Sequence, residues 1–371
     1  MQPEPRILQL CHGYDGPFMD CARQYAVLFD NTPYKVTTVY LTGAPSEAVR
    51  VGSASDEVIF LNQSSSDIRG LKLSAIRAVR RIAAQRNFHL CLAHRFKPIY
   101  VALLATSLPV IGIHHAFGGY KRLGRRLFVS LFRRRLVLLG VSDAVRDDVR
   151  RRLPGWPAEQ ILTLYNRLDV AVCQSRLFSR EEARQRLSLP VNAWIVATVG
   201  RLHPDKDPQT LLKAFALALP QLPSDSLLVI MGSGRLEREL KQLAQALGIG
   251  SQVIFTGQVA EGRRYFRAFD VFALPSDHEP FGMVLLEAMA ADVPVIATDC
   301  GGAREIVAGA GRLFPLGDVA QLAQQLVEMA AGDPVPQIEA QMRRLQDCFT
   351  DICAKQKFFE LPGVNSHLTL L

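Results

Sequence analysis

Two cationic side chains and two glutamates in the second half of the sequence could bind a charged ligand rich in hydroxyl groups. Arg201 and Lys206 lie five residues apart, directly after an apolar run. A guanidinium offers a planar fork and an ammonium a point charge, and together these suit a diphosphate. Glu279 and Glu287 lie eight residues apart, and Glu287 interrupts an otherwise apolar segment. Because an unpaired buried carboxylate is costly, we expect Glu287 to accept hydrogen bonds from vicinal sugar hydroxyls.

Glycines follow two further apolar runs. The segment Met231-Gly232-Ser233-Gly234 has Glu at position 237, where the dinucleotide-binding fingerprint GxGxxG requires a third glycine, so a dinucleotide site is poorly supported. The segment Cys300-Gly301-Gly302 could turn free backbone amides towards an anion. No P-loop is present. The glycines therefore fit loops that approach a ligand or another backbone closely.

We expect no metal site and no cofactor. Asp205-Lys206-Asp207 is formally a DxD string, a pattern associated with manganese. Lys206 within that string would supply the positive charge that a metal otherwise supplies, so we interpret the string as coincidental. The seven cysteines show no CxxC spacing, and the histidines lack the spacing of metal ligands. The odd number of cysteines also argues against a disulfide framework.

The elements that must position these residues alternate between strands and helices. Short apolar runs at 7–11, 35–41, 89–93, 110–113 and 136–141 predict buried strands, and helical patterns at 20–29, 74–86 and 143–152 lie between them. The alternation resumes after a polar stretch, with strands at 194–199, 226–231, 252–255, 271–273 and 294–297 and helices at 179–187, 209–218, 237–247 and 283–290. This pattern is typical of parallel sheets covered by helices.

The length of 371 residues and the polar stretch at 174–190 predict two domains. We expect an N-terminal Rossmann-like domain over 1–172 and a C-terminal one over 173–345, with the tail from about 346 to 371 packing back on the first. Two such α/β domains would face each other across a cleft, because parallel sheets bind ligands at the carboxyl ends of their strands.

The motifs and their order over 194–317 resemble the large family 4 of retaining glycosyltransferases, which have the GT-B architecture. The resemblance rests on the Arg201/Lys206 pair, the spacing from Glu279 to Glu287, Pro275-Ser276 and Gly301-Gly302. In the first half, segments beginning at Ile111, Val141 and Tyr165 resemble family motifs more loosely. Among family members, the chain looks like the lipopolysaccharide core glucosyltransferases.

The resemblance implies a role for each matching residue. Arg201 and Lys206 would bind the donor diphosphate, Glu279 the transferred sugar, and Glu287 the ribose. His114 would line the sugar site, and Asp20 would lie near the acceptor. The remaining residues of the implied donor site are Phe281, Gly282, Met283, Val284, Gly16 and Gly200. The implied chemistry is metal-independent transfer of a hexose, with retention, from a nucleotide sugar that we expect to be UDP-linked.

The net charge of +8 is concentrated in one segment. Residues 71–152 carry 18 Lys or Arg against three acids, a net of +15, whereas the rest of the chain is net negative. The basic residues are densest over 121–135, and this part predicts a basic amphipathic helix with leucines and phenylalanines on one face. The basic residues expected on the other face are Lys121, Arg122, Arg125, Arg126 and Arg133. The helix fits two interpretations, an ordinary surface helix or contact with an anionic membrane.

The predicted function is transfer of a hexose to a cell-surface glycolipid or oligosaccharide, with lipopolysaccharide core as the expected acceptor. The N-terminus lacks a long apolar region, and no apolar run approaches 20 residues, so we expect a cytoplasmic protein. The membrane interpretation of the basic helix would place it at the inner face of the cytoplasmic membrane. One alternative is a nucleotide-sugar epimerase or phosphorylase of the same fold. Another is a basic nucleic-acid-binding protein, although no nucleic-acid module accompanies the charge and we expect no such partner.

Overall fold

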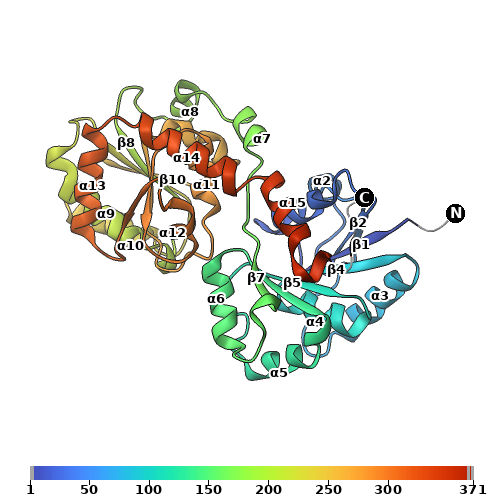
Figure 1. The fold of residues 1–371 in the computed structure, drawn as a ribbon. Helices are drawn as coiled ribbons and strands as arrows, with labels where there is room; N and C mark the ends of the chain where they lie inside the picture. The colour runs from blue at the N-terminus through green and yellow to red at the C-terminus, as the bar shows by residue number, and fades with distance from the viewer. Residues whose placement is uncertain (1–3, 366–367, 369–371) are drawn as a thin grey trace. The chain divides into compact units, whose positions relative to one another are not determined.

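The computed structural model describes residues 4–365 and 368, which divide into two α/β units. The first unit comprises residues up to Asn166 together with those from Asp351 onwards, and the second comprises Arg167–Thr350 (Figure 1). The sequence-based boundaries lay at 172/173 and about 345/346. None of the described helices is long and apolar enough to cross a bilayer.

The first unit contains a seven-stranded parallel sheet with the order β3-β2-β1-β4-β5-β6-β7. Its strands are β1 (Arg6–Cys11), β2 (Lys35–Tyr40), β3 (Glu57–Phe60), β4 (Phe88–His94), β5 (Val110–His114), β6 (Leu136–Gly140) and β7 (Ile161–Thr163). The expected strands therefore form, and β3 and β7, which the apolar pattern did not predict, complete the sheet. Both are short, with four and three residues.

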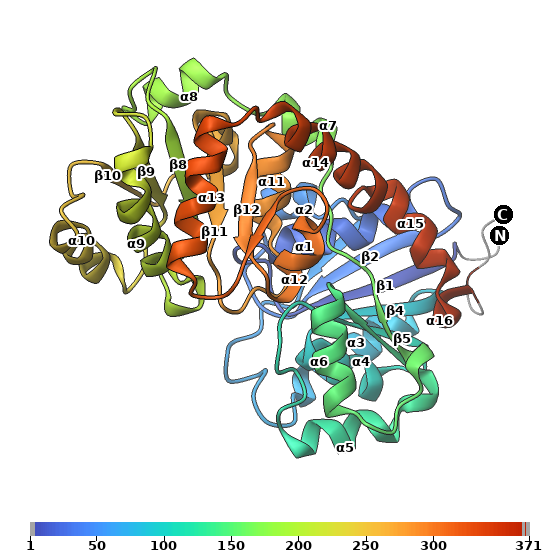
Figure 2. The same ribbon diagram turned by 60° about the vertical axis from the view of Figure 1, so that its left-hand side comes forward.

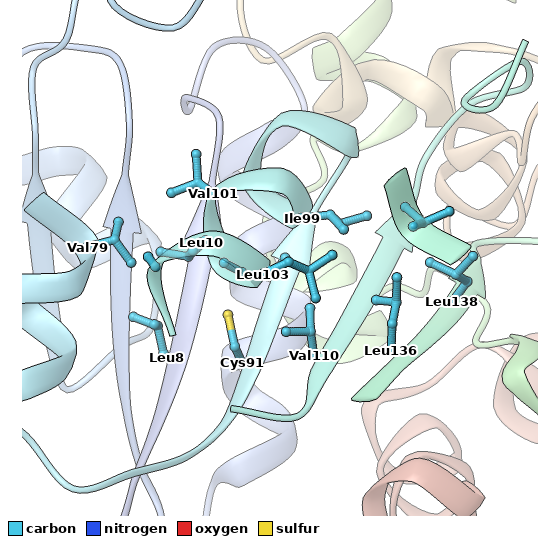
Figure 3. Close-up of a cluster of buried hydrophobic side chains, with 14 of the residues drawn as sticks. Leu8, Leu10, Val79, Cys91, Ile99, Val101, Leu103, Val110, Leu136 and Leu138 are labelled. Carbon is cyan, nitrogen blue, oxygen red and sulfur yellow. The ribbon is translucent and has the colours of Figure 1, made fainter. Parts of the chain in front are cut away.

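Helices cover both faces of this sheet. They are α1 (Phe18–Ala26), α2 (Glu47–Gly52), α3 (Leu73–Ala84), α4 (Phe96–Ala105), α5 (Leu123–Leu131), α6 (Asp143–Arg152), α15 (Asp351–Glu360) and α16 (Pro362–Asn365). Figure 3 shows the core on the face covered by α3 and α4, where Leu10 of β1, Leu103 of α4 and Leu138 of β6 belong to one buried cluster. Alternate residues of β1 point to the other face, where Gln9 donates a hydrogen bond to the carbonyl of Ala22 in α1 (3.1 Å).

The C-terminal helix α15 belongs to the first unit (Figure 2). The rings of Phe358 and Phe359 lie 5.7 and 5.9 Å from that of Phe29, edge to face. Lys355 also donates a hydrogen bond to the carbonyl of Asp30, 325 residues earlier in the chain. These contacts explain why the end of the chain closes the first unit, whereas the preceding helix, α14, packs in the second.

The second unit contains a six-stranded parallel sheet with the order β10-β9-β8-β11-β12-β13. Its strands are β8 (Ile195–Val199), β9 (Leu227–Met231), β10 (Val253–Gly257), β11 (Val271–Leu274), β12 (Val295–Thr298) and β13 (Arg312–Phe314). Its α-helices are α7 (Val170–Ser175), α8 (Arg180–Arg186), α9 (Pro208–Ala218), α10 (Glu237–Ala246), α11 (Met283–Ala290), α12 (Gly301–Val307), α13 (Val319–Ala331) and α14 (Val335–Cys348). Both units thus have the parallel, doubly wound architecture that the βα alternation predicted.

A buried ion pair anchors α8 to the second sheet. The guanidinium of Arg184 is fully buried, and it lies 2.9 Å from the Asp270 carboxylate, just before β11. It also donates to the carbonyl of Ala268 (2.9 Å). The Asp270 carboxylate in turn accepts a hydrogen bond from the backbone N–H of Ile195, at the start of β8 (2.8 Å). A buried guanidinium satisfied in this way makes α8 an integral part of the second unit.

Candidate functional site

The strand order of the second sheet changes direction between β8 and β11. The chain moves outward from β8 to β9 and β10, then crosses back to β11 on the other side. In an open parallel sheet, connections on the two sides of this point leave the carboxyl ends in opposite directions and create a ligand-binding crevice. The loops that flank it are residues 200–207 after β8 and 275–282 after β11. These are the loops that carry Arg201, Lys206 and Glu279.

An ion pair joins the two loops. The Lys206 ammonium lies 2.6 Å from a carboxylate oxygen of Glu279. The Glu279 side chain is only 8% exposed, and that of Lys206 is 23% exposed. The backbone reinforces the link, since Asp277 N–H donates to the carbonyl of Asp205 (3.1 Å). The fold therefore brings together a cation and a carboxylate that are 73 residues apart in the sequence.

The side chains around Lys206 form a second set of polar contacts. Arg201 is largely exposed, and its guanidinium lies 3.3 Å from the Asp205 carboxylate. His203 Nδ1 hydrogen-bonds to the same carboxylate. Asp207 accepts a hydrogen bond from the hydroxyl of Thr210 in the first turn of α9 (2.6 Å). Both carboxylates of the DxD string are thus engaged by side chains of the protein.

The glycines of the second unit allow loops to pack backbone against backbone. A Cβ on Gly302 would lie 2.5 Å from the Cα of Phe281, and one on Gly301 would lie 2.3 Å from the carbonyl oxygen of Glu279. The N–H of Gly302 donates to that carbonyl (2.8 Å), so this amide of the segment is not free to face an anion. A Cβ on Gly232 would similarly lie 1.8 Å from the carbonyl of Gly200. The glycine pairs therefore hold the 200–207 and 275–282 loops in place.

Helix α11 presents a narrow, partly exposed face at this edge. Gly282 precedes the helix with a φ of +107°, a left-handed conformation in which most other residues would be strained. Most of α11 is buried, but Met283, Val284 and Glu287 are only partly so. Burial and the neighbouring Glu287 carboxylate raise the pKa of the Cys173 thiol to about 11. Glu287 therefore lies on the accessible face of an otherwise buried helix.

The layer beneath the loops contains polar groups that the sequence did not single out. Cys300 Sγ lies 3.2 Å from the carbonyl of Ser276, and the hydroxyl of Thr298 donates to the same carbonyl. Burial raises the pKa of the Cys300 thiol. Phe281 packs against the ring of Phe349, 5.9 Å away. The sequence could have indicated these groups, because Thr298 and Cys300 lie two residues apart at the end of an apolar strand.

The predicted residues of the first unit lie at the carboxyl edge of its own sheet. His114 ends β5 and is buried, with Nε2 3.1 Å from the Tyr120 hydroxyl. Burial lowers the pKa of His114 to about 4, so its imidazole is neutral at pH 7. Asp20, in α1, accepts hydrogen bonds from Arg23 and Gln24 of the same helix (3.2 and 2.9 Å). Gly16, with φ +58°, lies in the loop before α1.

Helix α5, which corresponds to the basic helix predicted from the sequence, differs from that prediction. Phe128, Val129 and Phe132 pack on the core, but successive residues of a helix are 100° apart, so the leucine row at 123, 127 and 131 falls outside the buried face. These leucines are 65%, 61% and 81% exposed, so the prediction that leucines and phenylalanines share one face is wrong. Lys121, Arg122 and Arg133 are exposed as expected.

Two of the arginines assigned to the polar face are turned back onto the protein. Arg125 donates to the carbonyl of Gly119 (2.9 Å), and its guanidinium lies 4.6 Å from the centre of the Phe96 ring. Arg126 donates to the carbonyl of Tyr120 (2.8 Å). These bonds satisfy the carbonyls that precede α5. The prediction that both side chains project away from the protein is therefore wrong.

Two family models match the chain. The glycosyl transferases group 1 model matches residues 179–341, and the glycosyltransferase family 4 model matches residues 28–172. The chain belongs to these glycosyltransferase families. The group 1 match falls within the second α/β unit, whereas the family 4 match covers most of the first unit and continues to residue 172, past its boundary at Asn166. The loops that carry Lys206 and Glu279 lie within the group 1 domain.

Solved glycosyltransferase structures share the fold of the whole chain. A glycosyltransferase from Rickettsia africae matches with a TM-score of 0.82 at 16% identity, covering 96% of this chain and 97% of its own. Anabaena HepE in complex with UDP and glucose matches with a TM-score of 0.74 at 23% identity, covering 99% and 100%. WaaG, a glycosyltransferase involved in lipopolysaccharide biosynthesis, matches with a TM-score of 0.66 at 17% identity, covering 96% and 100%. The expected GT-B fold is confirmed.

Curated relatives match over shorter stretches. An uncharacterised glycosyltransferase of Methanocaldococcus jannaschii is 33% identical over 46% of this chain and 44% of its own length. A D-inositol 3-phosphate glycosyltransferase of Rhodococcus opacus is 38% identical over 37% of this chain and 34% of its own. The chain thus spans less than half of the length of these relatives.

Proposed function

We propose that this protein is a retaining glycosyltransferase that transfers a hexose from a UDP-linked sugar to a phosphorylated or lipid-linked saccharide. The observation that carries the proposal is the Lys206–Glu279 ion pair, held at the point where the second sheet changes direction. A donor diphosphate bound there would meet the Lys206 ammonium and the exposed Arg201 guanidinium. The complexes of HepE with UDP and with UDP-glucose support the choice of nucleotide.

Each side chain at this edge has a task in the proposed mechanism. Lys206 and Arg201 stabilise the charge that develops on the departing diphosphate, which is where electrostatic catalysis acts. Glu279, released from Lys206 as the diphosphate takes its place, accepts hydrogen bonds from hydroxyls of the transferred sugar. Glu287, on the accessible face of α11, does the same for the ribose. Because Lys206 supplies the charge, the transfer requires neither a metal ion nor a cofactor.

Retention follows in this proposal from attack on the face that the diphosphate leaves, with the leaving phosphate accepting the proton of the acceptor hydroxyl. A retaining glycosidase instead uses a nucleophilic carboxylate about 5 Å from a second carboxyl group. Glu279 is already ion-paired with Lys206. This pairing suits a carboxylate that binds hydroxyls and an ammonium that binds phosphate better than a carboxylate that attacks the sugar covalently.

The test is a donor screen with UDP-glucose, UDP-galactose, UDP-N-acetylglucosamine and GDP-mannose, followed by NMR of the product's anomeric proton. We expect transfer from one UDP-sugar, with retained configuration, in the presence of a chelator. Lys206→Ala should lower turnover by about 10²–10³-fold. Free sugar phosphate or an epimerised donor as the sole product would instead identify a phosphorylase or an epimerase, and inversion or a need for metal would refute the mechanism.

Glu287 allows a separate test of donor binding. Glu287→Ala should weaken UDP binding, measured by calorimetry, by roughly 10-fold or more, because one charge-assisted hydrogen bond contributes about 1.5–3 kcal/mol. Glu237→Ala in the exposed first turn of α10 is the matched control and should leave UDP binding unchanged. Equal affinity of the Glu287 variant and the unaltered protein would contradict the ribose assignment.

We also propose that the protein binds the inner face of the cytoplasmic membrane through α5. The exposed leucines at 123, 127 and 131 form one row, and Lys121, Arg122 and Arg133 lie at its ends. Apolar side chains next to basic ones complement an anionic bilayer, where each basic group near the surface contributes about 1 kcal/mol. A membrane location would suit a glycolipid acceptor such as lipopolysaccharide core.

Vesicle co-sedimentation tests this contact. Binding to vesicles of equimolar phosphatidylglycerol and phosphatidylcholine should fall when Leu127 and Leu131 are both replaced by Ser, and it should fall further at high salt. Leu217→Ser, at an exposed position of the second unit, is the control. Unchanged binding by the double leucine variant would refute the role of α5. Binding of DNA or RNA that persists at physiological salt would instead favour the nucleic-acid alternative.

A further inference from the structure

A group of cations gathers where the first sheet changes direction. In the order β3-β2-β1-β4-β5-β6-β7, that point lies between β1 and β4. Arg95 follows β4 directly, and Lys97 lies in the first turn of α4. Lys72 precedes α3, which packs beside α4. The cations therefore come from separate segments near the edge of the sheet where ligands of parallel sheets bind, and the charge of Lys97 interacts with those of Arg95 and Lys72.

Aromatic rings hold three cations of this group. The Arg95 guanidinium lies 4.8 Å from the centre of the Phe18 ring, at the start of α1. The Lys72 ammonium lies 4.5 Å from the centre of the Tyr100 ring, in α4. The Arg125 guanidinium is stacked over Phe96, one turn before Tyr100. Ring faces attract and position cations without neutralising their charge.

The cations of this group have no carboxylate partners. Within residues 4–365 and 368, no ion pair joins Lys72, Arg95, Lys97 or Arg125 to an Asp or Glu. Burial and repulsion from the neighbouring arginines lower the pKa of Lys97. Burial and the charges of Lys97 and Arg125 likewise lower the pKa of Lys72. An anion among these groups would relieve both the repulsion and the loss of hydration.

The backbone at Arg95 is held in a conformation that side chains rarely adopt. Its φ of +73° and ψ of +168° fall in a region populated almost solely by glycine. Such residues persist where surrounding structure fixes them, and they cluster at functional sites. Here the conformation places an arginine, rather than a glycine, directly at the N-terminus of the ten-residue helix α4. The first N–H groups of that helix add positive potential to the cation group.

We propose that Lys72, Arg95 and Lys97 bind a phosphate group carried by the acceptor. That the phosphate belongs to an acceptor rests on the proposed glycosyl transfer, whereas the anion site itself does not depend on that proposal. A single carboxylate would neutralise one charge, whereas a phosphate offers up to two charges and several oxygens to cations that converge from separate elements. The same chemistry is found in a soluble sugar phosphate and in a phospholipid headgroup.

Site-resolved lysine acylation tests the anion site without any enzymatic turnover. Lysines with a lowered pKa are more often unprotonated at neutral pH, so Lys72 and Lys97 should react readily with trace acetic anhydride, as read by peptide mass spectrometry. Inorganic phosphate should slow their acylation at least threefold. Lys241, which is ion-paired in the second unit, should not respond. Equal slowing by sodium chloride at the same ionic strength, or no slowing by phosphate, would overturn the proposal.

Two further probes distinguish the source of the phosphate. Protection by glucose 6-phosphate would indicate a soluble acceptor, and protection by vesicles of equimolar phosphatidylglycerol and phosphatidylcholine alone would indicate a lipid headgroup. Either result supports a phosphate site. Protection by neither, together with none by inorganic phosphate, would overturn it.

Variants connect the site to transfer. Lys97→Gln should raise the KM for a phosphorylated acceptor at least tenfold while the affinity for UDP stays unchanged. Arg95→Gly, which keeps the backbone conformation, should also abolish protection of Lys97 by phosphate while the protein remains folded by circular dichroism. Lys35→Gln, at the exposed start of β2, is the control in the same unit and should change neither the KM nor the protection of Lys97. If no acceptor is ever glycosylated but phosphate still protects Lys97, the glycosyltransferase proposal fails and the anion site stands.

Discussion

Removing Lys206 should destabilise the second unit because it leaves the Glu279 carboxylate buried without its partner. The carboxylate is 8% exposed and lies 2.6 Å from the ammonium. Breaking a buried pair by deleting one member costs about 3–5 kcal/mol, mostly from the uncompensated charge that remains. Because Lys206 is partly open to water, we expect Lys206→Met to lower the free energy of unfolding by about 3 kcal/mol at pH 7.

The double variant separates this effect from the loss of other contacts. Lys206→Met combined with Glu279→Gln removes both charges, so its cost should fall short of the sum of the single costs by about 1–3 kcal/mol. Lys241→Met is the control, since its ion pair with Glu237 is exposed on α10 and should contribute no more than about 0.5 kcal/mol.

The assay is urea unfolding followed by tryptophan fluorescence. The chain contains two tryptophans, Trp156 in the first unit and Trp194 in the second, so Trp156→Phe leaves a reporter for the second unit alone. This matters because two units can unfold separately, and a single transition would then mix them. A Lys206→Met cost below about 0.5 kcal/mol would refute the reasoning.

Three further predictions follow from contacts described above. Gly302→Ala should lower both the thermal stability of the second unit and its affinity for UDP, because the added Cβ would lie 2.5 Å from a backbone carbon; Gly155→Ala, with open space around its Cβ, should change neither in melts and calorimetry. Arg184→Met should cost about 1–3 kcal/mol in urea unfolding because the carbonyl of the buried residue Ala268 loses its donor and Asp270 keeps only Arg180 of its two arginine partners, whereas Arg186→Met, at an exposed position of the same helix, should cost under about 1 kcal/mol, and equal costs would contradict the anchoring role. The pKa of His114 is lowered to about 4, so the stability that its neutral form contributes is present above pH 6.5 and is lost as pH falls towards 4; His114→Gln should flatten this dependence in the first unit, and an unchanged profile would show that other groups cause it.

The sequence determined the fold class and most of the strands. Apolar runs separated by helical patterns predict parallel sheets, because only a strand buried on both faces is continuously apolar. The runs at 7–11 and 110–113 became β1 and β5 with at most small changes at their ends. The short strands β3 and β7 were not predicted, because the periodicity of three or four residues is too weak to distinguish a strand from a loop.

The pair of Lys206 and Glu279 illustrates what spacing could and could not predict. The residue types suggested a site for a diphosphate and a sugar, and the resemblance assigned both residues to it. Their direct contact depends on the strand order, since β8 and β11 are neighbours only because the chain crosses back over the sheet. No local sequence pattern predicts that the chain crosses back over the sheet at this point.

The basic helix shows the opposite case, where a strong local pattern misled. Leucines and phenylalanines with i+4 spacing predict one apolar face, but the two rows are offset by 100°, and only packing decides which row is buried. The cations at 72, 95 and 97 were likewise visible only as part of a net charge of +15. The sequence by itself determined the parallel α/β units and the chemical types at their loops. The tertiary structure alone decided which of those groups meet, because contacts between distant segments depend on strand order and on the side of each helix that finds a core.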